Sequence, residues 1–248
     1  MTRLTTFADA DATAARAAEE IARQVRRARE ARGVAQLALS GGSTPARTYE
    51  LLVAALPDWD GVEVWFADER CVPPEDEESN YRLAAETLLR PAGIDPARVH
   101  RMEGELGPEE GARRYADTLG EHVSRDGDPP TQPTLPVLDL IALGIGPDGH
   151  VASLFPDAPT LDAGEQAICL GVHDSPKPPP ERITLSLAML QAARHCLLLA
   201  IGAGKANAIA AALAEPSRHV PASLLRRERL TIIVDDAASR RQACDEAL

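Results

Sequence analysis

The chain has 248 residues, a mass of 26.5 kDa and a formal net charge of −12, with 44% hydrophobic and 26% charged residues. This composition allows a real core and excludes wholesale disorder. The acidic surface argues against nucleic acid or an anionic membrane as a partner, and no apolar run approaches the roughly 18–20 residues of a membrane span. The four cysteines lie far apart, so we expect neither a disulfide scaffold nor a zinc site.

Apolar runs alternate with amphipathic helical stretches along the whole chain. In the first helix Ala14, Ile21 and Val25 share one face, and charged residues occupy the other. In chain order we expect a helix over 11–32, a strand over 36–39, a helix over 45–56, a strand over 62–66, helices over 79–89 and 108–123, strands over 137–143 and 167–172, a helix over 185–192, a strand over 195–201, a helix over 204–214 and a strand over 230–234.

This alternation predicts an α/β fold, a mostly parallel sheet with helices on both faces. We expect one domain over residues 1–248, because the two proline-rich segments, 129–136 and 176–180, are too short to be domain linkers and are interpreted as surface loops. The chain starts with a charged helix rather than an apolar signal core. We therefore expect a cytoplasmic protein, either a monomer or a homodimer.

Ligands of parallel sheets bind at the carboxyl ends of strands, and four loops there carry unusual residues. The first is Ser40-Gly41-Gly42-Ser43-Thr44-Pro45. Its glycines let the backbone approach a ligand, Pro45 suits the first helical position, and Ser43 or Thr44 can cap that helix. The loop is therefore interpreted as a phosphate cradle rather than an ordinary capped turn, and it matches neither a serine-nucleophile elbow nor an ATPase loop.

The second loop, 67–72, follows the strand that ends at Phe66. It carries Asp68, Glu69 and Arg70, which can bind sugar hydroxyls or stabilise a developing charge. A solvated charge cluster is the alternative.

The third loop, Gly144-Ile-Gly146-Pro-Asp148-Gly149-His150, follows the most hydrophobic strand. It formally matches a dinucleotide fingerprint, but Asp148 would face the pyrophosphate and Pro156 would cut the following helix short. We interpret the glycines as shaping a tight turn that presents Asp148 and His150 to a cleft. His150 is then the candidate general base.

The fourth loop is Ile201-Gly202-Ala-Gly204-Lys205. Lys177 and Lys205 are the only lysines among 26 basic residues. A cation at a helix start is unfavourable for the helix dipole, and a bound anion offsets that penalty. Together the loops predict a small phosphorylated substrate, held by local N–H groups, Lys205 and an arginine.

Five motifs in this order resemble the 6-phosphogluconolactonase family, over about residues 35–234. They are Leu39-Ser-Gly-Gly-Ser-Thr-Pro45; Phe66-Ala-Asp-Glu-Arg-Cys-Val72 with Ser79-Asn-Tyr81; Gly144-Ile-Gly-Pro-Asp-Gly-His-Val-Ala-Ser-Leu-Phe-Pro156; Arg182-Ile-Thr-Leu-Ser186; and Gly202-Ala-Gly-Lys205. The resemblance implies a Rossmann-like domain that hydrolyses 6-phospho-D-glucono-1,5-lactone to 6-phosphogluconate in the oxidative pentose phosphate pathway, with no metal or organic cofactor.

The resemblance also implies roles for individual residues. His150 would activate water. As a separate hypothesis, we expect Asp148, two residues earlier in the same loop, to orient the imidazole. Arg182, Lys205 and the loop 40–44 would hold the phosphate.

Asp68 and Arg70 would line the sugar end, with Arg70 or backbone N–H groups as the oxyanion stabiliser. The related glucosamine-6-phosphate deaminases are the rival function, but they carry a glutamate where this chain has Phe155, and a tyrosine in place of Arg70. A sugar-phosphate-binding module without catalysis is a third possibility.

Overall fold

The computed structural model describes residues 2–123 and 135–240. Its strands are β1 (Arg3–Phe7), β2 (Ala35–Leu39), β3 (Val62–Phe66), β4 (Asp68–Arg70), β5 (Leu140–Gly144), β6 (Cys169–Val172), β7 (Arg182–Leu185), β8 (Cys196–Ala200) and β9 (Leu230–Asp235). Its α-helices are α1 (Ala10–Arg32), α2 (Ser43–Ala55), α3 (Asn80–Ala84), α4 (Pro108–His122), α5 (Leu187–Ala192), α6 (Ala206–Ala212) and α7 (Asp236–Ser239).

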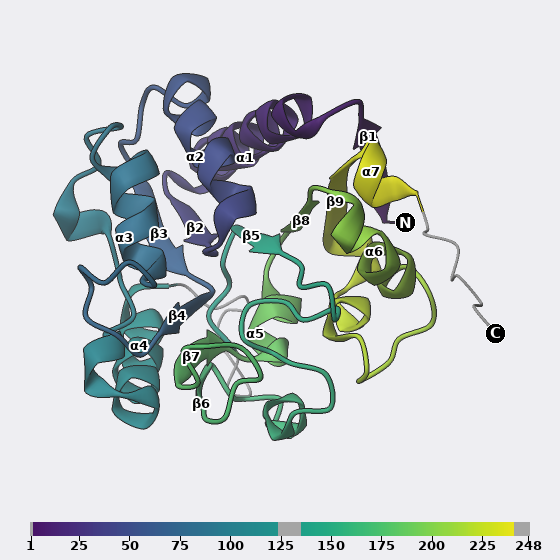
Figure 1. The fold of residues 1–248 in the computed structure, drawn as a ribbon. Coiled ribbons are helices and arrows are strands. Elements are labelled where there is room, and N and C mark those ends of the chain that lie inside the picture. Colours follow the sequence, from purple (N-terminus) through teal and green to yellow (C-terminus); the bar gives the residue numbers. More distant parts are fainter. Residues whose placement is uncertain (1, 124–134, 241–248) are drawn as a thin grey trace.

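Six of the strands form one parallel sheet in the order β1-β9-β8-β5-β2-β3. Figure 1 shows α1 and α2 on one side of these strands and α4 and α5 on the other. The expected fold class, a mostly parallel α/β sheet with helices on both faces, is confirmed.

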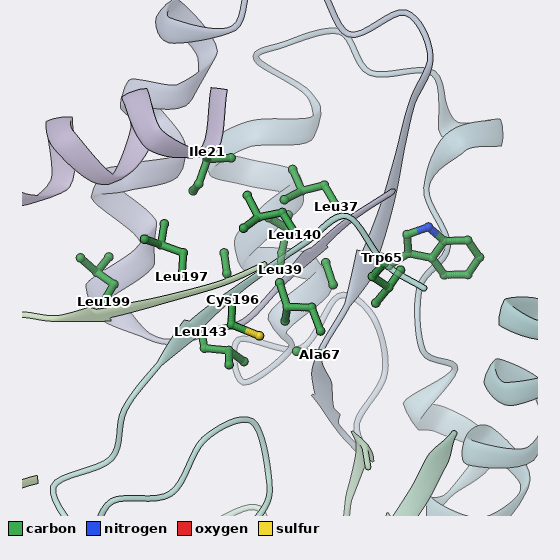
Figure 2. Close-up of a cluster of buried hydrophobic side chains, with 14 of the residues drawn as sticks. Ile21, Leu37, Leu39, Trp65, Ala67, Leu140, Leu143, Cys196, Leu197 and Leu199 are labelled. Carbon is green, nitrogen blue, oxygen red and sulfur yellow. The ribbon is translucent and has the colours of Figure 1, made fainter. Parts of the chain in front are cut away.

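The central strands lack polar alternation because both of their faces are covered. All five residues of β2 and of β8 are buried. Leu37 pairs with Leu140 across β2 and β5, and Ile21 from α1 joins the same cluster (Figure 2). Packing in this core sets where each strand ends within the sheet. It therefore also sets the positions of the loops that follow the strands.

A second, antiparallel sheet in the order β4-β7-β6 covers the carboxyl end of β3. It corrects two expectations: residues 68–70 form a strand rather than a loop, and Leu185 ends β7 rather than beginning a helix. Three polar residues have no strand signature of their own. Their pairing with Arg182–Leu185, more than a hundred residues later, makes them a strand.

Other element boundaries shift by a few residues. The strand expected from residue 137 begins at Leu140, and the helix expected from residue 204 begins at Ala206 after a 3₁₀ turn. The helix expected over 79–89 is α3 followed by a π-helical turn, and β1 was not anticipated.

The loop expectation for residues 176–180 agrees with the structure, whereas most of the other proline-rich segment lies outside the described residues. Within residues 2–123 and 135–240, no helix has the length and apolar character needed to cross a membrane.

Candidate active site

A cavity of about 240 Å³ lies at the carboxyl ends of the neighbouring strands β8, β5, β2 and β3. Its lining is Ser40, Gly41, Gly42, Thr44, Pro45, Asp68, Arg70, Asn80, Gly144, Ile145, Gly146, Pro147, His150, Ala152, Lys177, Arg182 and Lys205. The cavity thus gathers residues from all four loops selected in the sequence. Two of the selected residues, Asp148 and Ser43, are not part of the lining. Asp148 is hydrogen-bonded to the lining residue His150, and Ser43 is the first residue of α2.

The turn after β2 presents the beginning of α2 to the cavity. The helix begins at Ser43, so Gly42 occupies the cap position and has no side chain to cap with. The expectations that Pro45 is the first helical residue and that Ser43 or Thr44 caps the helix are therefore wrong. Gly42 has a φ of 107°, which strongly favours glycine. The first N–H groups of this 13-residue helix remain available to an anion.

Gly41 is required by the close approach of a neighbouring side chain. A Cβ added at Gly41 would lie 1.7 Å from Oδ1 of Asn80. Asn80 is held there because its Nδ2 donates to the carbonyl oxygen of Asp68 at 2.8 Å and lies 3.3 Å from the Asp68 carboxylate. This amide is thus bonded to the first residue of β4 and packs against the turn after β2.

Three buried polar atoms of the lining have no hydrogen-bond partner among the described residues. They are Ser40 Oγ, Arg70 Nε and Asn80 Oδ1. Buried polar groups are nearly always paired, so three unpaired ones in one cavity indicate a site that a polar ligand completes.

His150 and Asp148 form a hydrogen-bonded pair at the edge of the cavity. Nδ1 of His150 lies 2.6 Å from Oδ1 of Asp148, so the neutral imidazole carries its proton on Nδ1 and donates it to the carboxylate. Nε2 then keeps a lone pair that can accept a proton from a reactant. A Cβ at Gly146 would lie 2.0 Å from that Nδ1, so only glycine leaves room for the pair.

The environment of His150 favours the neutral imidazole. Burial lowers its pKa, the Asp148 carboxylate raises it, and the Lys177 ammonium lowers it again, with a net pKa below the ordinary 6.5. Burial raises the pKa of Asp148, but His150 and Lys177 outweigh it and hold that pKa below its usual value. The pair is therefore a carboxylate beside a neutral base.

Lys177 reaches this pair from the proline-rich loop. Its Nζ lies 3.4 Å from Oδ1 of Asp148 and 3.3 Å from Nδ1 of His150. Because Nδ1 already donates to Asp148, the ammonium donates to the carboxylate and acts on the imidazole through its charge. Sequence reasoning did not select Lys177, although its rarity as one of two lysines was a usable signal.

Arg182 holds the proline-rich loop in place. Its Nε donates to the carbonyl of Pro179 at 3.1 Å, and its Nη2 donates to the carbonyls of Lys177 and Pro178 at 3.2 and 2.9 Å. Among the described residues Nη1 has no hydrogen-bond partner. Burial and the nearby Arg70 lower the pKa of Arg182.

Arg70 and Arg182 stand directly opposite each other on the paired strands β4 and β7. Like charges at such positions repel, and an anion between them removes that cost. Asp68 does not neutralise Arg70: its carboxylate accepts from Ser153 Oγ at 2.8 Å, and no ion pair between Asp68 and Arg70 occurs in the described parts of the chain. Arg70 instead lies 3.7 Å from the carboxylate of Glu78.

Lys205 completes a cationic lining. Its Nζ donates to the carbonyl of Ile145 at 2.7 Å, and burial followed by the Lys177 charge lowers its pKa. The lining thus contains two lysines and two arginines against one carboxylate, that of Asp68, with Asp148 adjoining. In a chain of net charge −12, this is a local reversal of sign suited to an anionic ligand.

Phe155 forms an apolar wall behind the base. Its ring centroid lies 4.7 Å from that of His150 and 5.8 Å from the Arg182 guanidinium carbon. Phe155 itself is buried. It therefore offers no proton-transfer group beside His150.

The family model described as glucosamine-6-phosphate isomerases/6-phosphogluconolactonase matches residues 8–234. The chain belongs to this family. It is 38% identical to a 6-phosphogluconolactonase of Streptomyces coelicolor over 96% of this chain and 93% of the relative, and 38% identical to that of Homo sapiens over 82% and 79%. A 6-phosphogluconolactonase structure from Trypanosoma cruzi matches with a TM-score of 0.85 at 25% identity, covering 98% of each chain. The resemblance indicated by the motifs is confirmed.

Sequence reasoning also passed over Asn80, which lines the cavity. Asn80 stands in the second quoted motif, where only its position between Ser79 and Tyr81 drew attention. Metal ligation has no candidate cluster in the part of the chain that the structure describes, since no three His, Cys, Asp or Glu side chains gather there.

Proposed function

We propose that this chain hydrolyses 6-phospho-D-glucono-1,5-lactone to 6-phosphogluconate. Relatives named 6-phosphogluconolactonase are 36–38% identical over 94–96% of the chain. The observation that carries the proposal is the hydrogen bond between His150 and Asp148 in a cavity lined by four cationic side chains. A base beside an anion site is what hydrolysis of a phosphorylated lactone requires.

In the proposed mechanism His150 Nε2 takes a proton from a water molecule as the water oxygen attacks the lactone carbonyl carbon. The tetrahedral intermediate then breaks its bond to the ring oxygen, which receives the proton from the imidazolium. The carbonyl carbon becomes a carboxylic acid, which releases the remaining proton of the water molecule to solvent and ionises to a carboxylate. General-base assistance of this kind contributes about 10²–10⁴ in rate, and an already reactive lactone needs little more than positioning in addition.

Asp148 acts on the base rather than on the substrate. Its bond to Nδ1 fixes the tautomer and stabilises the imidazolium that forms. The Lys177 ammonium lowers the pKa of His150, so that the imidazole remains neutral at pH 7. Arg70, with an unpaired Nε buried in the lining, is the proposed oxyanion donor.

The phosphate of the substrate is proposed to bind between the beginning of α2, Arg182 and Lys205. The N–H groups of residues 43 and 44 supply uncapped donors, and Nη1 of Arg182 has no hydrogen-bond partner among the residues that the structure describes. In this orientation Asp68 and Asn80 would form hydrogen bonds with the sugar hydroxyls. Anchoring the phosphate fixes the distance from the lactone carbonyl to His150.

Deamination of glucosamine 6-phosphate, the other activity in the family's description, is disfavoured by Phe155. Ring opening and isomerisation require further proton-transfer groups, and the residue packed on His150 is a phenylalanine. Glu69, the nearby buried carboxylate, is occupied by the backbone N–H groups of residues 70, 80 and 81.

The deciding experiment measures both reactions on one preparation. Fresh 6-phosphogluconolactone is followed in a pH-stat, and glucosamine 6-phosphate is tested for ammonia release. We expect turnover of the lactone, slow turnover of unphosphorylated gluconolactone, and no deamination. Binding of 6-phosphogluconate without lactone turnover would indicate a binding module, and equal rates for both lactones would contradict the phosphate anchor.

We further propose that residues 1–248 act as one catalytic domain, since both sheets contribute to the same cavity. The described cysteines, Cys71, Cys169 and Cys196, are free thiols, which supports a reducing compartment such as the cytoplasm.

A further inference from the structure

A second and larger cavity, of about 480 Å³, lies at the amino ends of the strands of the six-stranded sheet, opposite the carboxyl ends that hold the candidate active site. Asp139, His195 and Leu230 line it from the amino ends of β5, β8 and β9. Residues of α1 between 23 and 32 and Arg3 of β1 form much of its wall, and Arg194, Glu228 and Thr231 complete it. A five-residue strand is about 16 Å long, so this cavity is separate from the candidate active site.

Arginine dominates the lining of this second cavity. Its arginines are Arg3, Arg23, Arg27, Arg32 and Arg194, which stand against the two carboxylates of Asp139 and Glu228. The chain as a whole has a net charge of −12. The second cavity therefore has a positive net charge in a protein whose net charge is negative.

The existing ion pairs leave part of this charge without a partner. Arg32 and Arg194 approach the same oxygen of Asp139, at 2.5 and 3.3 Å. Arg23 donates through Nε to the buried Glu20 at 3.0 Å. Arg3 and Arg27 are exposed and stand on different elements, and neither side chain has a hydrogen bond or ion pair within the described residues.

His195 adds a titratable donor to the same wall. Its Nε2 lies 3.0 Å from Oγ1 of Thr231. Burial lowers its pKa, Glu20 raises it, and Arg23 and Arg27 lower it further. A bound anion would reverse the effect of the two arginines and favour the protonated imidazole.

We propose that this cavity is a second anion site, which binds a small, multiply phosphorylated ligand between Arg27 of α1 and Arg3 of β1. The cavity is twice the volume of the candidate active site, so it has room for more than one phosphoryl group, and the two guanidinium groups that have no partner among the described residues come from separate elements. Guanidinium groups bind phosphoryl oxygens in bidentate fashion. The site is independent of the proposed lactone hydrolysis.

The test uses inorganic pyrophosphate as the probe, titrated into the full chain at low ionic strength. Binding is measured by calorimetry, and the imidazole NMR signals of His150 and His195 report on the two cavities separately. We expect pyrophosphate to shift the His195 signals and to raise the pKa of that imidazole. Arg27→Gln and Arg3→Gln should each weaken this binding by roughly tenfold, the loss of one charged hydrogen-bond donor.

Arg90→Gln is the matched control, because Arg90 is an exposed arginine outside both cavities and the substitution changes the net charge equally. It should leave pyrophosphate affinity unchanged. Arg27→Gln should keep the wild-type rate of lactone hydrolysis, since Arg27 is remote from the candidate active site. The proposal is overturned if pyrophosphate perturbs His150 alone, or if Arg27→Gln, Arg3→Gln and Arg90→Gln bind it with the wild-type affinity.

Discussion

Gly146→Ala tests whether the geometry of the His150–Asp148 pair, rather than its presence, sustains the proposed hydrolysis. Gly146 does not have a positive φ, so alanine suits its backbone. The added Cβ would lie 2.0 Å from Nδ1 of His150 and 2.3 Å from Oδ1 of Asp148, whereas ordinary contact begins at 3.4 Å. The imidazole must therefore move by about 1.4 Å, the difference between 3.4 and 2.0 Å.

A misplacement of about 1 Å costs roughly a hundredfold in rate, or about 2.7 kcal/mol of transition-state stabilisation. We expect kcat/KM for the lactone to fall by about that factor in Gly146→Ala, while 6-phosphogluconate still binds through the beginning of α2 and Lys205. The assay is pH-stat kinetics on fresh lactone, with calorimetry for product binding.

Gly204→Ala is the control for this prediction. A Cβ at Gly204 meets no atom within 4 Å, and its φ is not positive. We expect wild-type kinetics and an unchanged melting temperature. If Gly146→Ala is as active as Gly204→Ala, the positioning argument is refuted, because the clash would then have no effect on the base.

Further predictions concern the base, the anchor and the pH dependence. His150→Ala should lower kcat by about 10²–10⁴ yet retain 6-phosphogluconate binding by calorimetry, and near-normal turnover would remove the base assignment. Lys205→Ala should mainly raise KM for the lactone, and an unchanged KM would count against its phosphate contact. The neutral form of His150 is the active one, so kcat/KM should fall on the acid side with a midpoint below pH 6.5, because the pKa is lowered; a midpoint above pH 6.5 would contradict this. Lys177→Gln removes a charge that lowers this pKa, so the acid limb should move to higher pH; a limb that stays in place would show that Lys177 does not act on the imidazole.

Local patterns in the sequence were enough to predict the parallel sheet and the edge at which ligands bind. A short apolar run such as 196–200 indicates a strand whose two faces are both covered, and in the structure all five of its residues are buried. Glycine turns at 41–42, 144–146 and 202–204 follow three such strands. Parallel strands place those turns at one edge, so His150, Lys205 and the beginning of α2 meet there.

Family resemblance, rather than local pattern, indicated Arg182 and the lactone. The contacts of Arg182 could not be predicted from the sequence. Two of its guanidinium nitrogens donate to backbone carbonyls of the proline-rich loop, and such contacts have no local sequence pattern. That arrangement brings Lys177 to the base, a contact between residues 27 positions apart that leaves no periodic signal.

The sequence by itself determined which segments form the central strands of the parallel sheet and which glycine turns follow them, since period and glycine placement are local properties. Tertiary structure alone decided that Asp68 bonds Ser153 rather than Arg70, that Asn80 closes over Gly41, and that arginines gather at the opposite edge of the sheet. Each of these depends on contacts between residues far apart in the chain, 85 positions in the case of Asp68 and Ser153, and such contacts form only when the whole sheet has assembled.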